Sequence, residues 1–126
     1  MIRTLLTLAL GLLLAVNAGS RQLVTEFTGS GSTSTTTREF EARAPWILDW
    51  RVNSDFQGAM AIEISLVDGR TSYHKGLILQ TKQPGNGVRL FNESGTFRFR
   101  ISSTLARWNL KIEELTREEA EQYTAR

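Results

Sequence analysis

The chain of 126 residues contains no cysteine, and this absence excludes several kinds of chemistry. Without a thiol the chain cannot form a disulfide, use a cysteine nucleophile or bind zinc through sulfur. A domain without disulfides must be held together by its core, which about 100 residues can provide. The sequence therefore predicts one cysteine-free domain with a substantial apolar core.

Histidine and net charge are also scarce. His74 is the only histidine, and no G-x-S-x-G motif accompanies it, so the sequence predicts no hydrolytic triad. The 15 basic and 13 acidic side chains give a net charge of +2, which does not indicate a polyanionic partner. We predict no catalytic residue, no metal ligand, no cofactor and no nucleic-acid partner.

Long hydrophobic runs are absent except at the N-terminus. Arg3 precedes an apolar run from Leu5 to Val16, and Val16-Asn17-Ala18 suits signal-peptidase cleavage after Ala18. The run is shorter than the ~20 residues of a spanning helix, and an uncleaved anchor is the alternative. We expect a signal peptide over residues 1–18, a periplasmic or secreted product, and no integral membrane protein after cleavage. Losing 18 residues, Arg3 among them, would leave 108 residues with a net charge of +1.

Alternating apolar side chains predict that most of the chain is β-strand. Residues 46–52 place two tryptophans, a leucine and a valine on one face, because successive strand side chains point to opposite sides. We interpret this segment as a central strand, with Trp108 and two phenylalanines completing the core. Further strands are expected at residues 22–28, 59–67, 73–79, 88–91, 96–102 and 107–113, with a strand or loop at 33–37.

Turn residues separate these segments. We predict a flexible link at Gly29–Ser32, a two-residue type I′ hairpin at Asp68-Gly69, a bulge at Gly76 and a turn at Pro84–Gly87. Turns recur every 8–12 residues or so, and no long helical period is present. The predicted fold is therefore all-β: an antiparallel, jelly-roll-like β-sandwich of about eight short strands over residues 19–115.

The C-terminal residues 116–126 differ from the rest. Thr116 and Glu119 have the spacing of a capping box, which predicts a short helix or a polar tail. Its only apolar side chains are Ala120 and Tyr123, so we expect weak docking.

Several core-strand patterns carry a family resemblance. They are Phe27-Thr28-Gly29-Ser30-Gly31, Phe40, Trp46-Ile47-Leu48-Asp49-Trp50, Gly95 to Ile101, and Trp108-Asn109-Leu110-Lys111-Ile112. On these residues the chain resembles small exported bacterial β-sandwich domains, jelly-roll or CUB-like, of unassigned function. Many such domains are lipoproteins or carry a cysteine pair, and this chain has neither. The resemblance implies the fold and an accessory or binding role, and it transfers no functional residue.

The candidate binding residues are basic side chains that alternate outward along predicted strands, together with one loop aromatic. They are Arg51, Arg98, Arg100, Lys111 and Tyr73. The basic side chains could form one stripe on an outer sheet face and meet carboxylates, sulfated glycans or phospholipid headgroups. Alternatively, Asp49, Glu63 and Glu113 interleave with the stripe and neutralise it by cross-strand pairing.

These observations predict a non-enzymatic, exported binding or accessory module. Its partner would be an envelope or secreted protein, contacted through a sheet face or through an edge at the Ser/Thr-rich segment. One alternative is a module that binds a carbohydrate or a lipid headgroup. Another is a small envelope hydrolase using His74 or the carboxylates Asp49 and Glu63. Calcium binding at Asn53–Asp55 lacks the D-x-D-x-D-G spacing and is not predicted.

Overall fold

A computed structural model describes residues 21–124, and this part of the chain contains seven strands and one helix. All paired strands are antiparallel, which confirms the predicted all-β, antiparallel class. The elements are β1 (Gln22–Thr36), β2 (Phe40–Ala42), β3 (Trp46–Asn53), β4 (Ala61–Asp68), β5 (His74–Thr81), β6 (Gly85–Phe91), β7 (Gly95–Glu114) and α2 (Arg117–Thr124).

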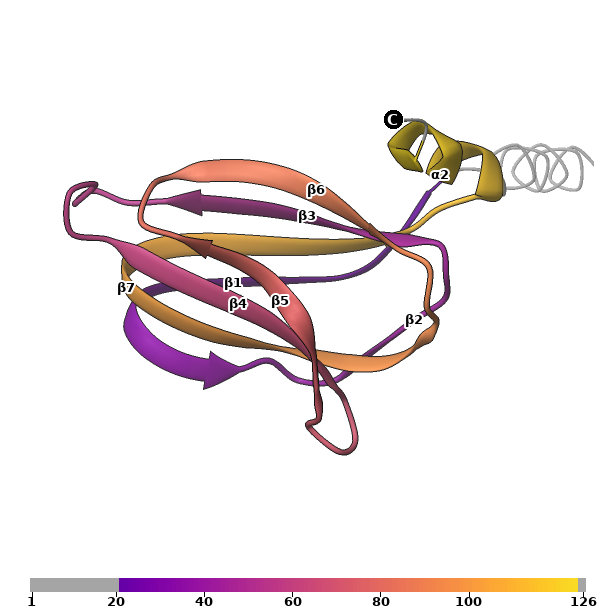
Figure 1. Ribbon diagram of the computed structural model, residues 1–126, viewed down its shortest axis with the longest axis horizontal. Helices are drawn as coiled ribbons and strands as arrows, with labels where there is room; N and C mark the ends of the chain where they lie inside the picture. Colours follow the sequence, from indigo (N-terminus) through magenta and orange to yellow (C-terminus); the bar gives the residue numbers. More distant parts are fainter. Residues whose placement is uncertain (1–20, 125–126) are drawn as a thin grey trace, which may run out of the picture.

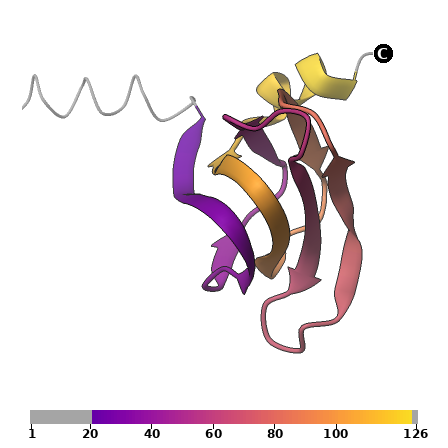
Figure 2. The same cartoon turned by 90° about the vertical axis from the view of Figure 1, so that its left-hand side faces the viewer.

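The 20-residue strand β7 organises the sheet (Figure 1). One edge of β7 pairs with β4 along its first half and with β3 along its second half, which gives the order β5-β4-β7-β3-β6. The other edge pairs with β1 and β2. The strand bends near Leu105, whose φ is 51°, and its halves lie in two layers that face each other (Figure 2). We call the layer with β5 and β4 layer A and the layer with β3 and β6 layer B.

The core lies between these layers. Trp46, Leu48 and Val52 of β3 are buried in it, and Trp50 packs against it half-buried, as the alternation predicts. The β7 residues Phe97, Phe99, Ile101, Trp108, Leu110 and Ile112 face them from both layers. Because one strand contributes to both layers, the two halves of the sandwich form a single curled sheet.

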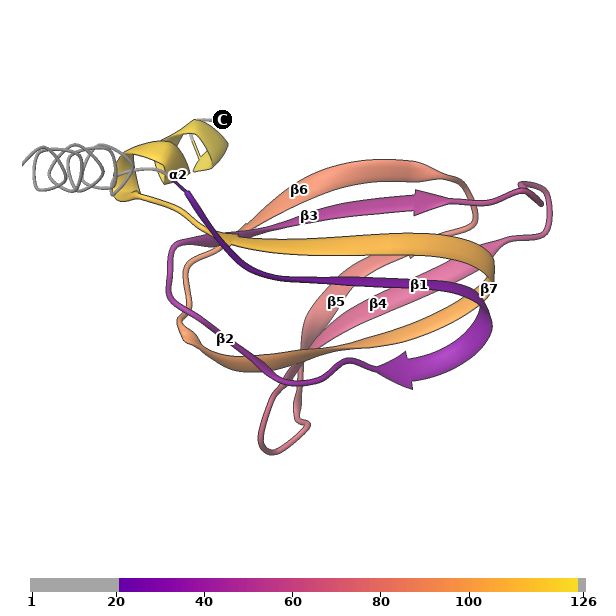
Figure 3. The same ribbon diagram turned by 180° about the vertical axis from the view of Figure 1, so that it is seen from behind.

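The strands are longer and fewer than predicted. The expected strands at residues 96–102 and 107–113 are the two halves of β7, so seven strands replace about eight. The predicted flexible link at Gly29–Ser32 is wrong, because these residues belong to β1 and bend together with β7 (Figure 3). Gly31 has a φ of 101° at this bend, which explains why a glycine stands there.

The predicted two-residue hairpin at Asp68-Gly69 is also wrong. The β4–β5 connection runs from Gly69 to Tyr73, and Asp68 N donates to Tyr73 O at 2.8 Å. Asp68 Oδ1 accepts from Arg70 N and Thr71 N, both at 2.9 Å. This Asx-type arrangement stabilises a longer loop than the dipeptide pattern alone predicts.

The predicted turn at Pro84–Gly87 lies earlier, at residues 82–84 between β5 and β6, and Gly85 to Gly87 form the start of β6. Gly87 pairs with Trp50, and a Cβ at Gly87 would lie 2.6 Å from Trp50 Cζ2. Gly87 therefore allows the indole ring of Trp50 to lie against the strand. Near Gly76 the β4–β5 register does shift, in agreement with the predicted bulge.

Helix α2 forms with the predicted capping box. Thr116 N donates to Glu119 Oε1 at 2.8 Å, and Glu119 N donates to Thr116 Oγ1 at 3.1 Å. Ala120 and Tyr123 pack with Ile47 and Leu115 on the outside of layer B. The predicted signal peptide lies outside the described residues. Within residues 21–124, no helix is long and apolar enough to cross a membrane.

Candidate functional site

The four predicted basic residues do not form one stripe. Arg98 and Arg100 lie on the first half of β7. Lys111 lies on its second half, and Arg51 lies on the neighbouring strand β3 of the same layer. Each alternates with core residues and therefore points outward from its own layer. Because β7 bends at Leu105, Arg98 and Arg100 project from layer A and the other two from layer B.

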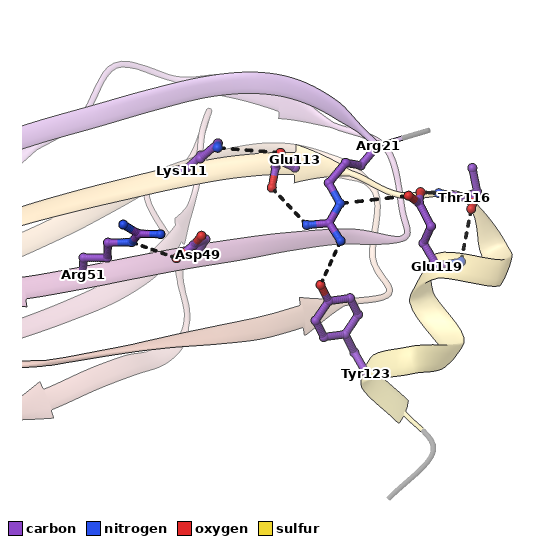
Figure 4. A network of polar contacts seen from close by, with 8 residues as sticks. All are labelled: Arg21, Asp49, Arg51, Lys111, Glu113, Thr116, Glu119 and Tyr123. Carbon is purple, nitrogen blue, oxygen red and sulfur yellow. Dashed lines mark hydrogen bonds and ion pairs between the residues drawn. The ribbon is translucent and has the colours of Figure 1, made fainter. Parts of the chain in front are cut away.

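Acidic side chains pair with the two cations of layer B (Figure 4). Arg51 Nε lies 3.7 Å from Asp49 Oδ1, and Lys111 Nζ lies 4.0 Å from Glu113 Oε2. The Arg51 side chain is 72% exposed, so its pair is solvated and weak. Acidic residues therefore interleave with these cations, but both pairs lie within one strand, so the predicted cross-strand pairing is wrong.

The remaining candidates have separate surroundings. Arg98 is half-buried and donates to Gly69 O at 3.0 Å, which ties β7 to the β4–β5 loop. Arg100 is exposed and has no ion pair among the described residues. Tyr73 is 75% exposed in the β4–β5 loop, away from Arg51 and Lys111 in layer B.

Arg21 connects the start of β1 with α2 (Figure 4). Its guanidinium donates to Tyr123 Oη at 3.3 Å and lies 3.7 Å from Glu113 and 4.0 Å from Glu119. Burial lowers the pKa of Arg21, but Tyr123 and the two carboxylates outweigh that effect and leave it raised. The N–H of Thr116 holds the pKa of Glu119 below its usual range. This network fixes the position of the helix against β1 and β7.

A depression of about 530 Å³ lies at one end of layer B, lined by polar side chains and also by Val52, Pro84, Gly85 and Trp108. We call its polar side chains the polar face: Arg51, Asn53, Asn86, Arg107 and Asn109. The register places Asn86, Arg51 and Asn109 in one row across three strands. Arg107 is paired with Asp55 at 2.7 Å, and Asn109 donates to Glu26 at 2.9 Å. The polar face therefore presents forked hydrogen-bonding groups of nearly balanced charge.

The second candidate is the open edge of β1. Within residues 21–124, β1 hydrogen-bonds to no strand other than β7, so the opposite edge of this 15-residue strand is unpaired. Between the register shift near the start of β1 and the one at its bend, Thr25 to Gly31 form a regular run of seven residues. Seven residues span about 23 Å of extended chain, enough for one added strand.

The hydrogen bonds of β7 determine which backbone groups of β1 are free. Leu115 N donates to Pro45 O, so odd-numbered residues in this half of β7 bond to β3. Even-numbered residues bond to β1, and their partners Phe27 and Gly29 direct their N–H and C=O groups into the sheet. The residues whose backbone groups point to the open edge are Glu26, Thr28 and Ser30.

The other unpaired edges are better protected than that of β1. Strand β5 is short, carries Lys75 and has two register shifts. Strand β6 is bridged to β5 by Arg89 Nη1, which donates to Leu77 O at 2.8 Å. In β1, Glu26 is the only charged residue and there is no proline. Lysine, bulges and short length are the usual protection of edge strands, and β1 has only the bulges.

A groove of about 450 Å³ runs along β1. We call it the β1 groove and use six of its residues: Phe27, Gly29, Thr33, Thr35, Arg38 and Trp108. Trp108 lies so close to β1 that a Cβ at Gly29 would be 2.3 Å from its Cζ2. In the described chain Trp108 Nε1 is buried and has no hydrogen-bond acceptor. Arg38 donates to Thr25 Oγ1 at 2.9 Å and lies over the Phe27 ring at 5.3 Å.

The residues considered for hydrolysis are far apart. Asp49 projects from layer B, whereas Glu63 projects from layer A and accepts a hydrogen bond from Gln80. His74 is exposed at the start of β5. Among residues 21–124, no three His, Cys, Asp or Glu side chains form a cluster that could hold a metal ion. The structure therefore does not bring the two candidate carboxylates together.

The comparisons with known proteins found likeness to solved structures. No protein-family model matches the chain, and no curated protein matches it. A solved structure that is similar is a carbohydrate binding module (CBM6cm-2) from Cellvibrio mixtus lichenase 5A, in complex with cellotriose. It is 14% identical, the alignment covers 76% of this chain and 86% of that chain, and the TM-score is 0.38.

Sequence reasoning did not identify the β1 groove. Trp108 was expected in the core, and it is 6% exposed, but the neighbouring glycine was assigned to a link. A signal was present: Gly29 stands in a segment that otherwise alternates as a strand, which marks a close approach by another group. No sequence pattern identifies Arg38 as a groove residue, because its position depends on the bend of β1 at Gly31.

Proposed function

We propose that this protein is an exported, non-enzymatic binding module that contacts a protein partner by adding one of the partner's strands to the open edge of β1. The single observation that carries the proposal is the unpaired edge of this 15-residue strand. An extended segment that pairs with such an edge gains main-chain hydrogen bonds at alternate residues.

The composition of β1 supports this role. A long edge without lysine or proline is a template for pairing, and natural proteins usually protect such edges. Its serine and threonine side chains keep the exposed strand polar while allowing the extended conformation. The neighbouring groove offers side-chain contacts that backbone pairing alone lacks.

A photo-cross-linking experiment tests the proposal. The protein carries benzoylphenylalanine in place of Thr28, or in place of Val88, which occupies the equivalent position on the open edge of β6. Both proteins are irradiated in an envelope extract, and the linked segment is identified by mass spectrometry and synthesised. We expect the Thr28 site, and not the Val88 site, to link to one extended segment.

Proline variants then separate edge pairing from other contacts. In Thr28→Pro an outward N–H is lost, while Val88→Pro loses the corresponding N–H at β6. We expect Thr28→Pro to weaken binding of the synthetic segment about fivefold and Val88→Pro to leave it within about twofold, because each edge hydrogen bond contributes about 1 kcal/mol. Equal binding by both variants, no cross-link at Thr28, or a cross-link joining two copies of this chain would overturn the proposal.

Export is part of the proposal and rests on the sequence of residues 1–18. When the full chain is expressed in a Gram-negative host, we expect a periplasmic product that begins at Gly19. The N-terminal sequence and the mass of the product measure this directly. An intact chain of 126 residues in the cytosol or in the membrane would contradict export and cleavage.

A second candidate function is glycan binding at the polar face. The row formed by Asn86, Arg51 and Asn109 supports it, because amide and guanidinium groups suit sugar hydroxyls and uronic-acid carboxylates. Trp46 and Trp108 are buried and do not provide a stacking surface. Titration with neutral and acidic oligosaccharides tests this candidate: binding lost in Asn86→Ala would support it, and no heat of binding would exclude it.

A further inference from the structure

We infer that the β1 groove recognises an acidic side chain, aspartate or glutamate, on the strand that adds to β1. This inference rests on the proposed function and specifies the chemistry of the partner segment. Three features of the groove support it: an indole N–H without an acceptor, a cation without a carboxylate, and the position of both next to the open edge.

The first feature is the indole N–H of Trp108. It is buried and has no acceptor within the described chain, and a buried donor without a partner is costly. By contrast, Trp46 Nε1 donates to Glu93 O at 2.9 Å, so the fold does satisfy another buried indole. An acceptor supplied by the ligand would remove the cost at Trp108, which favours a group with free lone pairs.

The second feature is the guanidinium of Arg38. Its side chain contacts a neutral hydroxyl, that of Thr25, and the face of the Phe27 ring. No carboxylate among the described residues forms an ion pair with it. Glu26 also lines the groove, but its Oε2 accepts from Asn109 on the other side of the sheet. An entering carboxylate would therefore meet a cation whose charge is unmatched.

The third feature is the location of these groups. Trp108 lies over Gly29 of β1, and Arg38 reaches back from the end of β1 to Thr25. The groove residues thus come from both sides of the bend in β1 at Gly31. In an added strand, alternate side chains point toward the inner side of β1, so the one beside Gly29 would face Trp108. Thr33 and Thr35 add hydroxyls that can donate to the same carboxylate.

Entry of the carboxylate requires a small rearrangement. Trp108 Nε1 is buried in the free protein, so some of the side chains that cover it must move when the ligand enters. Arg38 can move at low cost, because its side chain is held by one hydrogen bond and one ring contact. The ligand carboxylate then replaces the Thr25 hydroxyl as the acceptor of the guanidinium.

Peptide titration followed by NMR tests the inference. The probes are capped heptapeptides of alternating threonine and valine with aspartate, asparagine or lysine at the centre. The ¹⁵N-labelled protein gives one indole signal for each of its three tryptophans, and Trp108→Phe identifies the signal of Trp108. With the aspartate probe we expect this signal to move downfield, while that of Trp46 stays in place because it already donates to Glu93 O.

Affinities measured in the same titrations test the role of charge. We expect the aspartate probe to bind about tenfold more tightly than the asparagine probe, since charge-assisted hydrogen bonds are about twice as strong as neutral ones. Arg38→Gln should reduce this preference to about twofold. Arg70→Gln is the matched control, an exposed arginine in the β4–β5 loop, and should leave the preference unchanged.

The outcomes distinguish this inference from the proposed function. If all three probes bind equally and Thr28→Pro weakens them all, the open edge is correct and the acidic preference is wrong. An unmoved Trp108 signal during binding of the aspartate probe would also overturn the inference. If no probe binds at millimolar concentration, both the inference and strand addition fail.

Discussion

At the scale of single residues, glycines make room for two of the three indole rings of this protein. Gly29 gives room to Trp108 and Gly87 gives room to Trp50, since a Cβ at either position would be within 3 Å of the ring. Each glycine stands within a strand, where glycine is otherwise unfavourable. Their presence in β1 and β6 is therefore explained by close approach of a ring.

Alanine substitution at these glycines tests this explanation. We expect Gly29→Ala and Gly87→Ala to lower the free energy of unfolding by about 1–3 kcal/mol each, as overpacking does. The matched control is Gly58→Ala, because no atom lies within 4 Å of a Cβ at Gly58 and its φ is not in the left-handed region. Urea denaturation measures all three. A loss at Gly58 as large as at Gly29 would contradict the packing explanation.

At the scale of elements, β1 combines two roles along its two edges. One edge is hydrogen-bonded to β7 over the length of the strand, and the other is unpaired within the described residues. Residues of β1 therefore differ in whether their backbone N–H and C=O groups point to β7 or to the open edge, even where their side chains are the same. Thr25 and Thr28 are such a pair.

Proline at these two threonines distinguishes the edges. Thr25 pairs with Ile112, and Thr25→Pro removes a donor from the sheet, so we expect a loss of about 1–3 kcal/mol in unfolding free energy. Thr28 directs its N–H to the open edge, and proline is tolerated there, so Thr28→Pro should lose less than about 1 kcal/mol. Chemical denaturation measures both. The reverse order would show that the assignment of the open-edge residues is wrong.

At the scale of the whole molecule, two carboxylates link stability to pH. Backbone N–H groups of Thr71 and Arg70 hold the pKa of Asp68 below its usual range, and Thr116 does the same for Glu119. A lowered pKa in the folded state means that the ionised form stabilises the fold. That contribution is complete above the unfolded-state pKa values, near 4, and is lost as the pH falls through the lower folded-state values.

The pH dependence follows from this sign. We expect these two carboxylates to leave the melting temperature unchanged between about pH 7 and pH 5. Below about pH 4 their protonation should lower the melting temperature. In the double variant Asp68→Asn/Glu119→Gln the fall should be shallower, while the value at neutral pH should be lower than in the parent chain. Calorimetric scans across this range measure both. An equally steep fall in the double variant would exclude these carboxylates as the cause.

The sequence predicts the fold class and the core face of β3 because both depend on local alternation. Trp46, Leu48 and Val52 are buried as the period of two requires. The alternation in β7 changes from odd to even residues between Ile101 and Trp108, but it does not show that one strand bends there and enters a second layer. The split of Arg98 and Arg100 from Lys111 therefore could not be predicted. The open edge depends on which strands pair, a property of distant residues, and the β1 groove depends on that bend as well.

Amide hydrogen exchange tests the central claim most directly, because it measures the backbone groups that an added strand would use. The free protein is compared with its complex with the cross-linked segment or with the aspartate heptapeptide. We predict that the amides of Glu26, Thr28 and Ser30 exchange rapidly in the free protein and slow by about 100-fold or more in the complex. The corresponding amides of β6, those of Asn86, Val88 and Leu90, should not change. Protection at β6 or on the polar face, with unchanged exchange along β1, would contradict strand addition at this edge.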